Sequence, residues 1–208
     1  MTDYSLARHN MIQQQIRPWE VLDPRVLDVF DQVNRDHFVA DRYKGLAYAD
    51  CKIPVIEGES MLPPTVEGRM LQALRLEPGD TVLEIGTGCG YITACLANLA
   101  SQVTSVDIHA EATELARNNL EPLNLKNIIL GSISGLQDVN YSKRFDAIVV
   151  SAGSLKDIPQ NLKDALAING RLFAVTGDSP AKHAMLVTRV SHDEWVSEGL
   201  FETDIADL

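Results

Sequence analysis

A glycine-rich turn between an apolar run and a helical stretch is the part of the chain best suited to bind a ligand. Glycines stand at Gly86, Gly88 and Gly90, immediately after the apolar residues 81–85. Glycine lets the backbone approach a ligand closely, and the N-terminus of a following helix offers free N–H groups to a carboxylate or a phosphate. The pattern therefore predicts a ligand site at the carboxyl end of a strand.

The spacing of these glycines excludes two common phosphate-binding loops. A dinucleotide fingerprint, G-x-G-x-x-G, needs its third glycine at position 91, which is Tyr91, whereas this chain has it at Gly90. No segment matches the G-x-x-x-x-G-K-[ST] loop that cradles nucleoside triphosphates. The pattern that remains is E-x-G-x-G-x-G.

Two acidic residues near this loop indicate what it binds. Asp107 ends the next apolar run, about twenty residues after the loop, where an acid accepts hydrogen bonds from both hydroxyls of a ribose. Glu84 precedes the loop, and an anion there is unfavourable beside a pyrophosphate but favourable beside an ammonium group. We therefore expect S-adenosylmethionine, which carries both a ribose and an ammonium group. The alternative, a nicotinamide dehydrogenase, is opposed by Glu84 and Tyr91.

The elements that position this loop follow from the apolar pattern after Asp80. Short apolar runs alternate with helical stretches, which is typical of a parallel sheet covered on both faces. We expect strands at 81–85, 103–107, 128–130, 147–150 and 171–175, and helices at 92–100, 111–120 and 160–166. Two further runs, 184–190 and 195–203, predict an antiparallel hairpin that closes the sheet edge. The fold class is α/β, with a Rossmann-like sheet.

The N-terminal part of the chain is expected to form a helical layer beside this sheet. Apolar spacing predicts helices at 5–16, where Arg17-Pro18 stops the first one, at the segment that begins with Asp23-Pro24, and at 65–76. The stretch from Phe38 to Pro64 is irregular. We expect a single domain of residues 1–208, with a helical and substrate-side layer at 1–76 and a cofactor-binding core at 77–208.

Composition excludes several classes of protein. The chain has 208 residues with 18 Lys and Arg against 29 Asp and Glu, and its net charge of −11 disfavours nucleic acid and anionic membranes as partners. No apolar run approaches the roughly 20 residues of a membrane span, and the first residues lack a signal sequence, so we expect a cytoplasmic protein. Three cysteines without a CxxC pair exclude a disulfide scaffold, and five histidines form no metal-binding motif.

Several segments together resemble class I S-adenosylmethionine-dependent methyltransferases, and more narrowly the protein-L-isoaspartate O-methyltransferase family. The similar segments are 35–39, 48–50, 53–54, 82–91, 158–162 and 169–172. The resemblance implies methyl transfer to the carboxylate of isoaspartyl residues in damaged proteins, with those proteins or peptides as partners. The expected cofactor contacts are Glu84, Gly86, Thr87, Gly88, Gly90, Tyr91, Asp107, Ile108 and Ser132.

The chain departs from this family where the family handles its substrate. The family's T-I-S-x-P string, whose serine is regarded as the active-site residue, corresponds to residues 60–64, so Leu62 takes the place of that serine. Ser60 lies two residues away and shares a face with Leu62 in an extended segment. Ser60 and Leu62 are therefore the expected catalytic positions. The alternative is a divergent relative that acts on another acceptor or is not catalytic.

Two further residues, Ser132 and His109, lie near the expected cofactor site, and each has its own interpretation. Ser132 stands where the family's G-D-G string has an acid that is expected to contact adenine, and it still offers one hydroxyl. His109 follows Asp107 closely, and we expect it to be a solvated loop histidine, with a place beside the ribose as the alternative.

Overall fold

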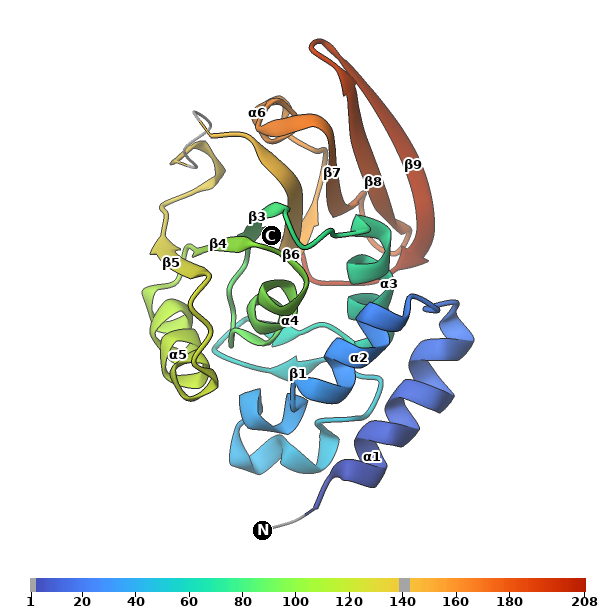
Figure 1. Cartoon of the computed structure of the whole chain (residues 1–208), viewed down its shortest axis with the longest axis vertical. Helices are drawn as coiled ribbons and strands as arrows, with labels where there is room; N and C mark the ends of the chain where they lie inside the picture. The colour runs from blue at the N-terminus through green and yellow to red at the C-terminus, as the bar shows by residue number, and fades with distance from the viewer. Residues whose placement is uncertain (1–2, 139–142) are drawn as a thin grey trace.

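A seven-stranded sheet forms the centre of the computed structural model, which describes residues 3–138 and 143–208 (Figure 1). Its strands lie in the order β5-β4-β3-β6-β7-β8-β9. Their bounds are β3 Thr81–Ile85, β4 Gln102–Asp107, β5 Ile128–Ser132, β6 Phe145–Leu155, β7 Leu166–Thr176, β8 Lys182–Ser191 and β9 Glu194–Thr203. The first five pair in parallel, whereas β8 and β9 add antiparallel strands at one edge. The predicted α/β sheet and its closing hairpin are confirmed.

Both faces of the central strands β3 and β6 are buried, which explains why these strands are largely apolar runs in the sequence. Val82 belongs to the core cluster that includes Leu96 of α4 (Tyr91–Leu99), whereas the next residue, Leu83, belongs to the cluster that includes Leu162 of α6 (Gln160–Asp164). The helix α5 (Ala110–Leu120) contacts β4 and β5. The prediction that a helix runs through 160–166 is wrong at its end, because Leu166 begins β7 and pairs with Phe145.

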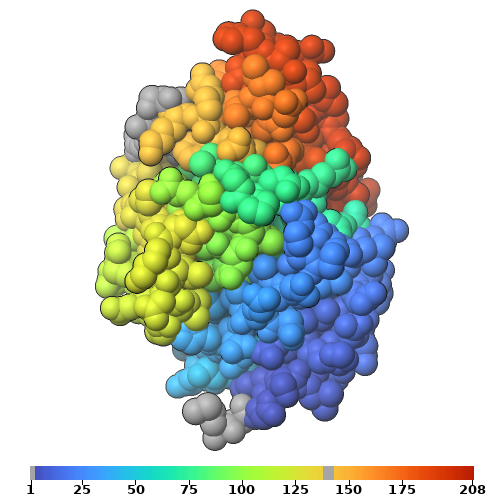
Figure 2. Space-filling view, viewed as in Figure 1, coloured from blue at the N-terminus to red at the C-terminus, as the bar shows by residue number. Residues whose placement is uncertain are grey.

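The N-terminal helices pack as a layer against one side of this core. Helix α1 (Ser5–Asn10) continues in π-helical turns at Met11–Ile16, and α2 (Pro24–Gln32) and α3 (Pro64–Leu74) follow. Asp23 caps α2 by accepting a hydrogen bond from the Arg25 backbone N–H at 2.9 Å. The predicted bounds 5–16 are confirmed, because α1 and the π-helical turns end at Ile16, and a separate 3-10 turn at Arg17–Trp19 follows. Figure 2 shows the blue N-terminal residues gathered below the green central part.

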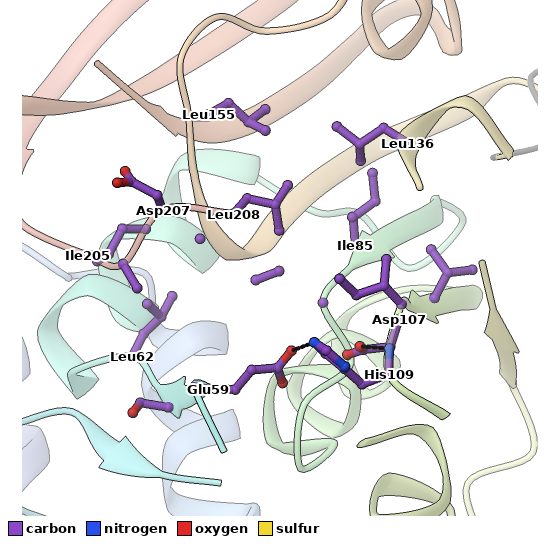
Figure 3. A pocket seen from close by; sticks show the side chains of 18 of the residues that line it. Glu59, Leu62, Ile85, Asp107, His109, Leu136, Leu155, Ile205, Asp207 and Leu208 are labelled. Atoms are coloured by element: carbon purple, nitrogen blue, oxygen red, sulfur yellow. Dashed lines mark hydrogen bonds and ion pairs between the residues drawn. The ribbon is translucent and has the colours of Figure 1, made fainter. Parts of the chain in front are cut away.

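The region that was expected to be irregular contains short elements only. Two-residue strands β1 (Ile53–Pro54) and β2 (Ser60–Met61) pair antiparallel, so that Ile53 faces Met61. Among the residues that the structure describes, the 3-10 turns are Arg17–Trp19, Arg35–Phe38, Asp41–Leu46, Glu121–Leu123 and Leu136–Asp138. The β1–β2 pair presents residues 57–62 toward the carboxyl ends of the parallel strands (Figure 3).

Across residues 3–138 and 143–208, no helix is both long enough and apolar enough to cross a membrane. In the same part of the chain all three cysteines are free thiols, with Cys89 and Cys95 buried.

Candidate active site

The glycine loop after β3 has a backbone that only glycine adopts readily. Gly86, Gly88 and Gly90 all have positive φ values, of 107°, 51° and 88°. A Cβ atom at Gly86 would lie 2.6 Å from the Cα atom of Ala152, closer than any packing allows. The loop therefore passes against β6 because position 86 lacks a side chain.

Asp107, at the end of β4, holds this loop in place while it faces a cavity. One carboxylate oxygen accepts the Gly88 N–H at 3.0 Å, and the other accepts the His109 N–H at 2.8 Å. Each carboxylate oxygen has two lone pairs, so both keep a free acceptor direction. The carboxylate is fixed by the backbone and is ready to accept two further donors.

A cavity of about 490 Å³ opens at the carboxyl ends of β3, β4 and β6. One wall carries Asp107 and His109, and the opposite wall carries Leu62, Ile205 and Asp207 (Figure 3). Gly86 and Ile108 also line the cavity. Residues 133–136, after β5, also line it. This is the edge at which open α/β sheets bind their ligands.

A second, smaller space of about 50 Å³ follows the glycine loop. Thr87, Gly88, Cys89 and Tyr91 line it on the loop side. The two cavities share residues 59–62 together with Gly86 and Ala152. Ser60 and Leu62 thus lie where a ligand that extends from Asp107 to the loop would pass.

Most of the expected site residues meet in these two cavities. Ser60, Leu62 and Gly86 line both; Asp107 and Ile108 line the larger one; Thr87, Gly88 and Tyr91 line the smaller one. Ser60 and Leu62 line the same two cavities, but Ser60 is exposed and Leu62 is buried, so their shared face stays a prediction.

Three expected cofactor contacts do not line either cavity. Gly90 begins α4, and its N–H bonds to the Thr87 carbonyl at 2.9 Å. The Ser132 hydroxyl lies 3.3 Å from the hydroxyl of Thr113, because its side chain points toward α5, and the following residues 133–136 face the cavity instead. Gly90 and Ser132 shape the site without reaching it.

Glu84 is the third expected cofactor contact that lines neither cavity. Its position corrects the prediction that its negative charge lies beside an ammonium group of the ligand. The side chain is fully buried, and one carboxylate oxygen accepts the Thr93 hydroxyl at 2.5 Å. Burial raises the pKa of Glu84 to about 8, against the opposing effect of hydrogen bonds from Thr93 and Ser105. The group is therefore mostly protonated at neutral pH and is directed into the core, so it does not present a negative charge to an ammonium group.

Two residues that the sequence did not single out as a pair meet at the cavity. Glu59 and His109 lie 3.2 Å apart, between their Oε1 and Nε2 atoms (Figure 3). Burial and then the nearby Asp107 charge raise the pKa of Glu59. His109 lines the cavity while its side chain stays 46% exposed, which agrees with the expected solvated loop histidine. Its place beside the ribose stays a prediction. The only signals in the sequence are their positions beside Ser60 and Asp107.

A buried ion pair fixes the backbone of Leu62. The Arg35 guanidinium is fully buried, pairs with Glu67, and donates from Nη2 to the Leu62 carbonyl at 2.7 Å. It also lies 4.8 Å from the centre of the Tyr91 ring. Burying a charge is costly unless it is paired, so Arg35, Glu67 and the Leu62 carbonyl hold one another in place.

These residues fit S-adenosylmethionine. Asp107 has acceptor capacity for two ribose hydroxyls, and Gly86 lines both cavities. The lining of the larger cavity includes apolar side chains such as Ile85, Ile133 and Leu136, which suit an adenine ring. Within residues 3–138 and 143–208, no group of three or more His, Cys, Asp or Glu side chains is placed to hold a metal ion.

Known proteins resemble this chain over nearly its whole length. The family model described as protein-L-isoaspartate(D-aspartate) O-methyltransferase matches residues 6–203. A protein-L-isoaspartate O-methyltransferase of Koribacter versatilis is 39% identical over 189 residues, covering 91% of this chain and 84% of that protein. One from Rhodopseudomonas palustris is 36% identical over 208 residues, covering 100% and 84%.

Solved structures show the same fold. A crystal structure from Plasmodium falciparum, described as a protein-L-isoaspartate O-methyltransferase in complex with S-adenosyl-L-homocysteine, superposes with a TM-score of 0.81 at 20% identity and covers 100% of this chain and 99% of that one. A second structure of that name gives a TM-score of 0.82 at 22% identity, covering 97% and 65%.

Proposed function

The chain belongs to the protein-L-isoaspartate(D-aspartate) O-methyltransferase family, and we propose that it transfers a methyl group from S-adenosylmethionine to the carboxylate of isoaspartyl residues in damaged proteins. One observation carries this proposal. The two parts of the family pattern, Asp107 with its glycine loop and the segment 60–62, face the same cavity although they lie far apart in the sequence. The location in the cytoplasm and the division into layers 1–76 and 77–208 remain predictions.

The proposed reaction needs positioning more than acid–base chemistry. An acceptor carboxylate is already ionised at neutral pH, so no general base is required. When bound, S-adenosylmethionine supplies a methyl group on a positively charged sulfur, which the acceptor oxygen takes while the sulfur leaves as a neutral thioether. The contribution of the protein is to align the two reactants and to exclude water from between them.

Each wall of the cavity has a part in this alignment. Asp107 accepts hydrogen bonds from the ribose hydroxyls, and the loop at Gly86, Thr87 and Gly88 gives the amino-acid part its room. Leu62 and Ile205 are apolar and keep water from the meeting point of the cavities. Ser60 is the hydroxyl at that point that can orient an acceptor carboxylate.

The first prediction concerns the hydroxyl groups that can orient the acceptor carboxylate at positions 60 and 62. Leu62→Ser should raise turnover on an isoaspartyl peptide about tenfold, or roughly 1.4 kcal/mol of transition-state stabilisation, because it adds an orienting donor. Ser60→Ala should lower turnover, because it removes the hydroxyl that takes over this role. The measurement is release of labelled methanol from the methyl ester.

Leu62→Ala is the matched control, since it shortens the side chain without adding a hydroxyl. If Leu62→Ala raises turnover as much as Leu62→Ser, space rather than hydrogen bonding limits the reaction. If neither Leu62→Ser nor Ser60→Ala changes turnover while both proteins fold and bind cofactor, the acceptor lies elsewhere.

A further inference from the structure

A short segment after the last strand forms a large part of one wall of the main cavity. All four residues from Ile205 to Leu208 line it. They lie across the cavity from Asp107 and His109, and Ile205 lies beside Leu62 (Figure 3). The cofactor half of the cavity is thus built from β3, β4 and the residues after β5, whereas the remaining half is closed by this segment.

The segment is held against β6 by its backbone. The Ser154 N–H donates to the Ala206 carbonyl at 2.8 Å, and the Leu208 N–H donates to the Ser154 carbonyl at 3.0 Å. A Cβ atom at Gly153 would lie 2.9 Å from the Ala206 carbonyl oxygen, so the close approach depends on the glycine. The wall therefore follows β6 as a short parallel strand would.

Lys182, the first residue of β8, holds the segment from its other side. Its ammonium donates to the Ile205 carbonyl and lies 2.7 Å from an Asp207 carboxylate oxygen. The lysine side chain is 1% exposed, whereas that of Asp207 is 79% exposed. The same Asp207 oxygen accepts the Ser154 hydroxyl at 2.8 Å. These contacts from Lys182 and then Ser154 hold the pKa of Asp207 below its usual value.

A buried ammonium costs free energy unless its N–H donors are satisfied, so the partners of Lys182 indicate the role of this residue. A residue that only filled space at this position would be apolar. The Ile205 carbonyl and the Asp207 carboxylate, which the Lys182 ammonium contacts, both belong to the wall segment and not to the cofactor half of the cavity. The lysine thus fixes the wall without touching the residues that face the ribose.

We propose that Lys182 is a positioning residue for the methyl acceptor, because it holds the segment 205–208 as the wall against which the isoaspartyl chain lies beside Ser60 and Leu62. This inference rests on the proposed function for the identity of the acceptor. It adds a specificity role for a residue far from the glycine loop in the sequence. Since the cofactor contacts lie on the opposite wall, cofactor affinity is independent of Lys182.

The test compares Lys182→Met, which keeps the length of the side chain and removes its donors, with the wild type. We expect KM for an isoaspartyl peptide to rise about five- to tenfold, with kcat and the Kd of S-adenosylhomocysteine within about twofold. Asp207→Ala, which removes one of the two partners of the Lys182 ammonium and leaves the Ile205 carbonyl, should raise KM about two- to threefold. Lys126→Met, at an exposed lysine outside both cavities, is the matched control and should change nothing.

Amide hydrogen exchange gives a reading that does not depend on turnover. In the wild type with S-adenosylhomocysteine, the isoaspartyl peptide should slow exchange at residues 205–208, and Lys182→Met should abolish that protection. Unchanged KM in both variants, or a loss of S-adenosylhomocysteine affinity as large as the rise in KM, overturns the inference. Turnover by the wild type without protection of 205–208 also overturns it, whereas absence of wild-type turnover on the peptide overturns the proposed function itself.

Discussion

Glu84→Gln should remove most of the loss of stability that the wild type shows as pH rises from 5 to 8. Burial raises the pKa of Glu84 in the folded protein to about 8, from an ordinary value of 4.5. Between these values the unfolded chain releases its proton and the folded chain keeps it, so stability falls as pH rises. The stability that the folded protein gains by keeping Glu84 protonated is complete below about pH 4.5 and is lost as pH rises to about 8. Its size is about 3–5 kcal/mol.

The physical reason is that Glu84 lacks a cationic partner. Its neighbours are the hydroxyls of Thr93 and Ser105, which favour the ionised form less than burial opposes it. Glutamine keeps the shape and stays neutral at every pH, so its unfolding free energy should be much flatter across this range. Urea unfolding at pH 5, 6, 7 and 8 measures the difference.

Glu111→Gln is the control for this experiment, because Glu111 is exposed in the first turn of α5. It should keep the slope of the wild type. If the unfolding free energies of the wild type and Glu84→Gln change in parallel with pH, Glu84 is ionised in the folded protein. The prediction from the sequence, that its negative charge favours an ammonium group beside the loop, would then hold.

Asp107→Ala should weaken S-adenosylhomocysteine binding by about 1–3 kcal/mol, or roughly 5- to 150-fold, because two ribose hydroxyls lose a charged acceptor. The loss includes the bonds that Asp107 accepts from Gly88 and His109, which hold the loop. Asp107→Asn keeps one acceptor oxygen and should fall between the wild type and Asp107→Ala. Calorimetry gives the three affinities.

S-adenosylmethionine serves as the second ligand, and NAD as the control ligand. Both sulfur-containing ligands should respond to the Asp107 substitutions in the same order, since they share the ribose. If the affinity of Asp107→Ala for both ligands is unchanged, the ribose binds elsewhere in the cavity and not at Asp107. Tight NAD binding without any response to either sulfur ligand would contradict the assignment of the cofactor.

Much of the fold was predictable because its signals are local. The run 81–85 was predicted with its observed bounds, since a short apolar run between turn residues has few other interpretations. The run 147–150 was predicted too short, because β6 spans Phe145–Leu155 and its two ends are set by pairing with β7 across register shifts. The residues from Phe38 to Pro64 had no periodicity to read, and their few elements depend on tertiary contacts.

The site was predictable where strand ends and glycines define it, as at Asp107 and Gly86. The direction of the Glu84 side chain was not predictable, because a strand buried on both faces shows no alternation between polar and apolar residues. The wall at 205–208 and the contact between Glu59 and His109 join segments far apart in the chain. No local pattern in the sequence marks such contacts.

The most direct test of the proposed function compares two peptides that differ only in one aspartyl linkage. The wild-type protein is incubated with methyl-labelled S-adenosylmethionine and either an isoaspartyl peptide or its normal aspartyl twin, and the methyl ester is measured as volatile methanol released at alkaline pH. The proposal predicts turnover on the isoaspartyl peptide well above that on its twin. Turnover on the isoaspartyl peptide at or below the rate on its twin would contradict it.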